Sequence, residues 1–187
     1  MRLKTVIACV MVWASASTAQ AQQGRETYRG IATGLIGATL GGDVPDPVLT
    51  LGGTVSVQEA SGWGTEMDVS WAKDNNGSTR KADITAIMIG ANWLRSRGNK
   101  PINPYLAFGI GALGLHGCLL PCSAPTTTWD LGLSTGGGVQ FAFNDIIGLR
   151  GDARYMFAPG SHDGSSRPAN WGFWRVSFGV GFGWAVQ

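Results

Sequence analysis

The chain has 187 residues, including 29 glycines, eight tryptophans and three cysteines, with 14 Lys and Arg residues against 12 Asp and Glu. This small excess of positive charge excludes the dense basic patch of a protein that binds nucleic acid or anionic membrane surfaces. Beyond the first residues, no stretch approaches the roughly twenty apolar residues of a membrane-spanning helix, so a helical membrane protein is also excluded.

The N-terminal segment has the three parts of a secretory signal peptide. Two basic residues precede a mostly apolar run at 5–14, and the small and polar stretch at 15–21 ends in Ala19-Gln20-Ala21. The apolar run is too short to cross a bilayer, and the final residues fit an A-x-A cleavage site. We therefore predict a signal peptide at residues 1–21, cleaved at its end.

The remaining residues, 22–187, are enough for one domain. They carry twelve residues of each charge sign, because both charges of the signal segment are basic. A lipid-anchored chain is the alternative, but Cys9 lies too early to leave an apolar region before the anchored cysteine.

Alternation of apolar with small or polar residues recurs along this domain, in segments of about ten residues separated by turn residues. The pattern predicts eight strands, at residues 28–40, 48–58, 63–73, 81–94, 103–115, 128–143, 146–157 and 172–184. In the first of them, "GIATGLIGATLGG" changes parity midway, which indicates a bulge at a glycine.

The two faces of the later strands differ in a consistent way. In "VLTLGGTVSVQ" and "WGTEMDVSW", large apolar residues alternate with threonine, glycine, serine and acids. The segment from Trp129 repeats the pattern, and in "WRVSFGVGFGW" one face is wholly apolar with an aromatic residue at each end. A soluble β-sandwich would carry Lys and Glu on its solvated face, whereas here glycine, serine and alanine dominate.

The apolar faces begin and end in aromatic residues, strand after strand. Small or polar inward residues and an apolar band edged by aromatic girdles are the pattern of an outer-membrane barrel. We therefore predict an all-β fold, an eight-stranded antiparallel transmembrane up-and-down β-barrel, rather than a secreted sandwich. The predicted girdle comprises Trp63, Trp71, Trp93, Trp129, Phe143, Trp174 and Trp184.

The connecting segments alternate in length when counted from a periplasmic N-terminus. Longer outer loops and short periplasmic turns are the usual asymmetry of such barrels. The predicted outer loops are 41–47, 74–80, 116–127 and 158–171, and the predicted periplasmic turns are 59–62, 95–102 and Asn144-Asp145.

The parity of the strands sends a set of charges to the inside of the predicted barrel. Arg or Lys on the lipid face near the membrane midplane would cost about 2–4 kcal/mol each. An eight-stranded barrel is just wide enough for side chains to fill, and confined charges must be paired. We therefore predict a polar, salt-bridged lumen without an open channel, and a gate or proton path is the alternative role of these charges. The inward set is Glu66, Asp68, Asp130, Arg150, Asp152, Arg154 and Arg175, with Gln140 and Asn92.

Two cysteines follow the signal segment, Cys118 and Cys122 in "HGCLLPCSAP". In an exported protein this pair is expected to form a small loop disulfide; redox sensing is the alternative. A metal site would need more ligands than the neighbouring His116, so neither a metal nor a cofactor is expected. Ser, His and Asp crowd together in "SHDGSSRP", a loop by composition, but a catalytic triad is defined by spatial roles.

The chain resembles the OmpA/OmpX-type small outer-membrane barrels, often labelled porin-like. The resemblance rests on "PYLAFGIGALG", "GGGVQFAF" with "GLRGDARYMF", and the closing "WRVSFGVGFGW". It implies a monomer in the outer membrane of a Gram-negative bacterium, surrounded by outer-membrane lipid and lipopolysaccharide and inserted by the assembly machinery. One departure is that the last aromatic residue, Trp184, is followed by three more residues.

The expected function is that of a non-enzymatic barrel that contributes to envelope integrity or surface interaction. A gated pore for small solutes and an adhesin acting through the outer loops are the alternatives. An acyl hydrolase of lipid is disfavoured, because both histidines, His116 and His162, are expected in loops.

Overall fold

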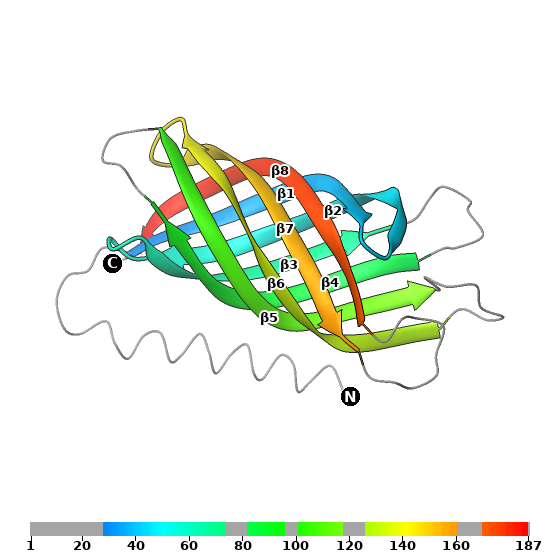
Figure 1. Ribbon diagram of the computed structural model, residues 1–187. Coiled ribbons are helices and arrows are strands. Elements are labelled where there is room, and N and C mark those ends of the chain that lie inside the picture. Colours follow the sequence, from blue (N-terminus) through cyan, green and yellow to red (C-terminus); the bar gives the residue numbers. More distant parts are fainter. Residues whose placement is uncertain (1–27, 74–81, 96–100, 118–125, 161–169, 187) are drawn as a thin grey trace.

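A computed structural model describes residues 28–73, 82–95, 101–117, 126–160 and 170–186. It forms a closed barrel in which each strand pairs with its sequence neighbours and the last strand pairs with the first (Figure 1). The strands are β1 (Tyr28–Gly41), β2 (Val44–Gln58), β3 (Trp63–Ala72), β4 (Ala82–Leu94), β5 (Ile102–Gly117), β6 (Thr126–Ala142), β7 (Ile147–Pro159) and β8 (Asn170–Val186). The predicted fold class is confirmed.

Several expectations lie outside the described residues. They are the signal peptide at 1–21, the cysteines Cys118 and Cys122, and the loop that contains His162. Among the residues that are described, no helix is long and apolar enough to cross a membrane.

We refer to the two ends of the barrel by their connections. The turn end holds the connections 59–62, 95–101 and 143–146, and the loop end holds the other four. Three of the connections at the loop end are shorter than predicted. β1 and β2 leave only residues 42–43 between them, and β5, β6, β7 and β8 each extend two residues further toward the loop end than the alternation indicated.

The predicted bulge in the middle of β1 is wrong. Pairing with β8 is unbroken from Tyr28 to Leu40, so the parity never changes. Leu35 simply faces the lumen, where it is 6% exposed, while Ile36 faces outward. In register, Leu35 lies between Gly52 of β2 and Gly179 of β8, whose missing side chains leave room for it.

The connection between β1 and β2 is a tight hairpin, whereas the sequence predicted a loop at 41–47. Gly41 and Gly42 have φ angles of 68° and 62°, a conformation that glycine adopts without steric cost. The register shifts just before the turn, where Leu40 lies opposite residues 45–47. Two of these three residues are prolines, which cannot donate a backbone hydrogen bond to the ladder.

The hairpin is fastened to the start of β8. The amide of Asp43 donates to the carbonyl oxygen of Gly172 at 2.9 Å, and the amide of Gly172 donates to Asp43 Oδ2 at 2.9 Å. The approach is so close that a Cβ atom on Gly42 would lie 2.1 Å from the carbonyl oxygen of Gly172. The first hairpin therefore belongs to the wall of the loop end.

The turns at the turn end are stabilised by local structure. The predicted 59–62 turn is confirmed, with Gly62 at a φ of 90°. In the connection 143–146, Asn144 Oδ1 accepts from the amides of Ile146 and Ile147 at 2.9 and 2.7 Å. An asparagine that bonds its own backbone in this way favours a turn over a continuing strand.

The outward face of the barrel is apolar and edged by aromatic residues at both ends. Trp63, Trp93, Phe143 and Trp184 lie at the turn end, and Trp71, Trp129 and Trp174 lie at the loop end. All are exposed except Trp93, which is half-buried against Trp63 with ring centroids 6.4 Å apart. Two aromatic belts around an apolar band suit a wall that faces lipid.

Candidate functional site

Among the described residues, the side chains that point into the lumen form three layers. A polar layer lies at the turn end, an ion-pair layer lies in the middle, and an apolar layer lies at the loop end. We define each layer below by its residues.

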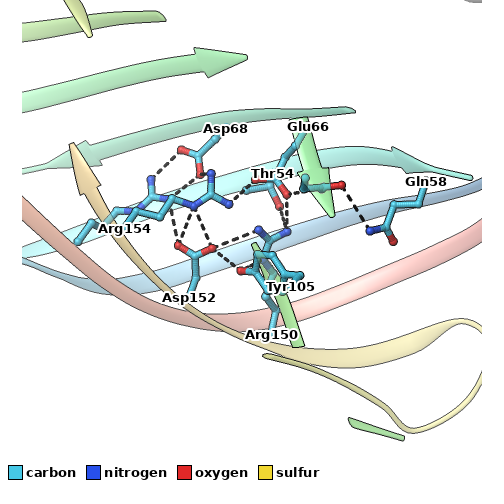
Figure 2. Close-up of polar contacts among 10 residues, drawn as sticks. Thr54, Gln58, Glu66, Asp68, Tyr105, Arg150, Asp152 and Arg154 are labelled. Carbon is cyan, nitrogen blue, oxygen red and sulfur yellow. Dashed lines mark hydrogen bonds and ion pairs between the residues drawn. The ribbon is translucent and has the colours of Figure 1, made fainter. Parts of the chain in front are cut away.

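The ion-pair layer joins opposite walls of the barrel. Its members are Glu66 and Asp68 on β3, Arg150, Asp152 and Arg154 on β7, and Arg175 on β8. In a closed order of eight strands, β3 and β7 are separated by three strands on either side, so they face each other across the lumen. Figure 2 shows Glu66 and Asp68 reaching toward the β7 side chains.

Glu66 binds two arginines at once. Arg150 Nη1 lies 2.8 Å from Glu66 Oε2, and Arg154 Nη2 donates to Glu66 Oε1. Asn92 of β4, also predicted to face inward, donates through Nδ2 to Glu66 Oε2 at 3.1 Å. The carboxylate is therefore held by three donors from two strands.

Asp68 and Arg175 form a two-pronged pair. Arg175 Nη1 and Nη2 donate to Asp68 Oδ1 and Oδ2 at 2.7 and 2.5 Å. This parallel arrangement is the strongest that a guanidinium and a carboxylate can make. Arg154 Nη1 lies 3.5 Å from Asp68 Oδ2 and joins this pair to Glu66.

Asp152 lies at the centre of the layer and contacts all three arginines. Arg154 Nε donates to both of its oxygens at 3.0 Å, Arg150 Nη2 donates at 3.2 Å, and Arg175 Nη2 donates at 3.5 Å. Two of these arginines lie two residues away on the same strand, where side chains point to the same face. The Arg-x-Asp-x-Arg spacing thus builds the core of the layer from a single strand.

Tyr105 of β5 is a member of the layer that the sequence reasoning missed. Its hydroxyl donates to Asp152 Oδ2 and accepts from Arg150 Nε at 2.8 Å, and the Arg150 guanidinium lies 4.5 Å from the centre of its ring. A signal was available, because in "PYLAFGIGALG" Tyr105 has the parity of the small inward residues. Thr54 of β2 was missed in the same way and accepts from Arg150 Nη1 at 3.1 Å.

The layer is electrically balanced and buried. It contains three carboxylates and three guanidiniums, and their side chains are at most 4% exposed. Burying a charge is costly unless it is paired and hydrogen-bonded, and each of these groups has at least two partners. Chemically, the layer can hold the walls together and obstruct ions; it presents no reactive group to a substrate.

The apolar layer corrects the prediction of a lumen that is polar throughout. At the loop end, Trp171 and Phe173 of β8 stack with ring centroids 5.7 Å apart and are 0% and 1% exposed. They belong to a buried cluster to which six strands contribute. The cluster comprises Val44, Val48, Ala72, Ile84, Ala86, Met88, Leu113, Leu115, Met156, Ala158, Trp171 and Phe173.

Asp130 faces inward as predicted but lies with the apolar layer. Its Oδ2 accepts from the indole nitrogen of Trp171 at 3.0 Å. Asp130 is the fifth residue of β6, counted from the loop end, and it pairs with Leu113, whose side chain is fully buried. Asp130 therefore lies at the height of the apolar layer and not in the ion-pair layer, because parity fixes the face of a residue and not its height.

His116 lies in β5, which corrects its expected place in a loop. It faces outward opposite Thr127, with His116 Nδ1 and Thr127 Oγ1 at 2.5 Å. Over the described ranges, no group of three or more His, Cys, Asp or Glu residues could hold a metal ion.

The polar layer consists of Gln58, Asn103 and Gln140, and a cavity lies beside it. It has a volume of about 60 Å³ and lies at the turn end, next to the ion-pair layer. The predicted inward residue Gln140 lines it, together with Gln58, Asn103 and Arg150. Gln58 Nε2 donates to Asn92 Oδ1 at 3.4 Å, which joins the polar layer to the ion pairs (Figure 2).

Solved structures with the same fold are distant in sequence. Neisserial surface protein A is 14% identical, with a TM-score of 0.57 over 83% of this chain and 95% of that chain. The N-terminal β-barrel domain of Pseudomonas aeruginosa OprF is 13% identical, with a TM-score of 0.58 over 87% and 100%. Ail, the attachment invasion locus protein of Yersinia pestis, is 16% identical, with a TM-score of 0.50 over 84% and 99%. A sequence comparison with curated proteins gives no match.

A family model extends this likeness from the fold to the sequence. The model described as "Outer membrane protein beta-barrel domain" matches residues 6–185, nearly the whole chain. The predicted location in the bacterial outer membrane is thereby confirmed. With its closed eight-stranded wall and its salt-bridged interior, the chain belongs to the outer-membrane protein β-barrel domain family.

Proposed function

We propose that this protein is a non-enzymatic, non-conducting barrel of the outer membrane that contributes to envelope integrity or to surface interaction. The observation that carries the proposal is the ion-pair layer, in which β3 on one wall is tied to β7 and β8 on the other. These ion pairs would obstruct the lumen and stabilise the barrel wall at the same time.

Two successive layers oppose the passage of a solute. An ion on its way through would have to separate pairs of buried charges, and a buried charge that loses its partner is strongly unfavourable. It would also have to pass the apolar layer, whose side chains are mostly apolar and would replace little of its water. The gated pore is therefore the weaker candidate.

The surface role would reside in the connections at the loop end. The segment between β5 and β6 carries Cys118 and Cys122, which we propose form a disulfide that stiffens it. We propose that outer-membrane lipid and lipopolysaccharide surround the apolar band, which is edged by aromatic residues at both ends of the barrel.

A deletion strain separates the two roles. We expect loss of the protein to raise the entry of an apolar dye into cells, or to lower the binding of cells to surfaces. Complementation then uses the full chain and a matched variant in which residues 118–125 are replaced by a Gly-Ser linker of the same length. A role in integrity predicts that both restore the barrier, whereas a surface role predicts that only the full chain restores binding. A deletion strain that behaves like the parent in both assays would reject the proposal.

A further inference from the structure

The outward face of the barrel carries a row of polar side chains at the loop end of β3 to β6. Asp83 of β4, His116 of β5 and Thr127 of β6 are neighbours in register, and the parity of their strands points all three outward. Lys73 directly follows β3 and lies over the outward ring of Trp71, with Nζ 5.8 Å from the ring centroid. The row therefore spans four neighbouring strands.

This row borders the loop-end girdle. We define the rim patch as the four polar residues of the row with the two girdle tryptophans beneath it, namely Trp71, Lys73, Asp83, His116, Thr127 and Trp129. Three strand spacings separate the two tryptophans, which is about 14 Å, and the polar row lies about 7 Å beyond them along the strands. Because aromatic girdles mark the boundary of the hydrocarbon, the polar row lies at the height of lipid head groups.

The girdle on the far side of β7 has a different neighbourhood. Trp174 of β8 pairs with Tyr155 on one side and with Leu40 on the other, and neither neighbour carries a charge. The polar row is thus a local feature of β3 to β6 and not a general property of the girdle.

Trp129 presents a flat surface beside the polar row. A Cβ atom on Gly114 would lie 2.9, 2.9 and 3.1 Å from Cη2, Cζ3 and Cε3 of Trp129. Three consecutive ring atoms at nearly equal distance mean that the face of the indole, and not its edge, covers the glycine. The opposite face points away from the barrel, and Trp129 is 54% exposed. An exposed indole face attracts the slightly positive C–H groups of a ligand, because the face of an aromatic ring is negative.

The polar row combines donors and acceptors with balanced charge. Lys73 and Asp83 carry one charge of each sign, and all four members of the row are exposed or half-buried. His116 Nδ1 and Thr127 Oγ1 lie 2.5 Å apart, so a hydrogen bond orients both side chains while it uses only one of the two ring nitrogens. A phosphate would be repelled by Asp83 and an ammonium by Lys73. An uncharged ligand with several hydroxyl groups can use the donors and the acceptors together.

We propose that the rim patch binds the uncharged sugar head group of a glycolipid in the surrounding membrane. The C–H face of one sugar ring packs on the indole of Trp129, and its hydroxyls bond Asp83, His116 and Thr127. The patch is shallow, but a lipid in the same membrane is held beside it at high effective concentration, so a weak contact suffices. The inference rests on the proposed function, which surrounds the apolar band with lipid, and it adds the class of lipid and its place.

Nanodiscs of controlled composition test the inference. The mature chain is reconstituted in phosphatidylcholine, which is then replaced stepwise by glucosyl diacylglycerol, by phosphatidylglycerol or by phosphatidylethanolamine with the same acyl chains. NMR follows the ring signals of His116 and the methyl signal of Thr127. We expect shifts that saturate with glucosyl diacylglycerol alone. Equal shifts with either phospholipid would overturn the inference, because the patch would then recognise charge.

Two tryptophan variants separate the patch from the girdle in general. Trp129→Leu keeps an apolar side chain but removes the flat face, and it is expected to weaken the glycolipid response about threefold or more. Trp174→Leu is the matched control in the same girdle and should leave the response unchanged. Thr127→Val removes one hydroxyl at an exposed position and should also weaken the response, followed at His116. Equal responses in Trp129→Leu and Trp174→Leu would overturn the role of the patch.

A soluble sugar distinguishes the source of the ligand. Methyl glucoside, added to nanodiscs without glycolipid, should give shifts that do not saturate, since nothing holds it near the rim. Saturable binding of methyl glucoside would overturn the membrane as the source. The outcome is also separable from the proposed function. Glycolipid binding by a protein whose deletion leaves cells unchanged would reject only the proposed function, and loss of the barrier on deletion without glycolipid binding would reject only the rim patch.

Discussion

In the lumen of this barrel, the contribution of a side chain depends on what reaches it from the opposite wall. Arg154 illustrates this, because it contacts Glu66 and Asp68 across the lumen and Asp152 on its own strand. Removing one member of a buried ion pair leaves the other charge buried without a partner. The free-energy cost of that lone charge is much larger than the free energy that the intact pair contributes to stability.

Truncation of Arg154 should therefore be among the most harmful single changes in the barrel. Arg154→Ala is expected to lower the free energy of unfolding by about 3–5 kcal/mol. Denaturant titration of the refolded barrel in lipid vesicles measures it. Lys73→Ala, at an exposed position, is the control and should change the value by less than about 0.5 kcal/mol. A similar small change in both variants would contradict the account of the ion-pair layer.

The pair of Asp68 and Arg175 allows a double-mutant test. Asp68→Leu and Arg175→Met should each destabilise the barrel by about 3–5 kcal/mol, because each leaves a buried charge behind. The double variant removes both charges and should lose less than the two single losses combined. If the loss in the double variant equals the sum of the two single losses, the two groups do not interact.

At the scale of the element, the first hairpin depends on its glycines. Gly42→Ala places a Cβ atom 2.1 Å from the carbonyl oxygen of Gly172 at a positive φ angle. We expect a loss of about 1–3 kcal/mol in unfolding free energy. Gly34→Ala, in the middle of β1, is the control, because nothing lies within 4 Å of its new methyl group. An equal loss in the two variants would mean that the hairpin geometry is not the cause.

The apolar layer ties the loop end together through β8. Trp171 is fully buried, stacks on Phe173 and donates to Asp130 Oδ2, so its removal takes away packing and a hydrogen bond together. Trp171→Ala should cost about 3–5 kcal/mol. Trp174→Ala, three residues on but facing outward, should cost less. The reverse order of the two losses would refute a structural role of the apolar layer.

At the scale of the whole molecule, the sequence predicted the architecture well. Strand parity depends only on the period of two, and that period is visible in most of the eight segments. The inward direction of Glu66, Arg150 and Arg175 followed from it. Which acid meets which arginine did not follow, because the partners lie on strands far apart in the sequence and the stagger between strands sets their relative heights.

The apolar layer was missed for a related reason. The prediction equated large apolar residues with the lipid face, so Met156 was not considered for the lumen, and it placed Trp171 in the predicted loop 158–171. The same assumption produced the false bulge in β1, where Leu35 faces inward. Glycines on neighbouring strands make room for such residues, and that compensation becomes visible only once the register is known.

The central claim is that the lumen is closed, and single-channel conductance tests it most directly. The mature chain is refolded, checked for a heat-dependent shift in gel mobility, and recorded in a planar bilayer beside Arg150→Ala. The account predicts a silent bilayer from the folded wild-type protein, because the ion-pair layer and the apolar layer lie in series. Steady, discrete openings of the wild type that change in Arg150→Ala would contradict it and identify the barrel as a gated pore.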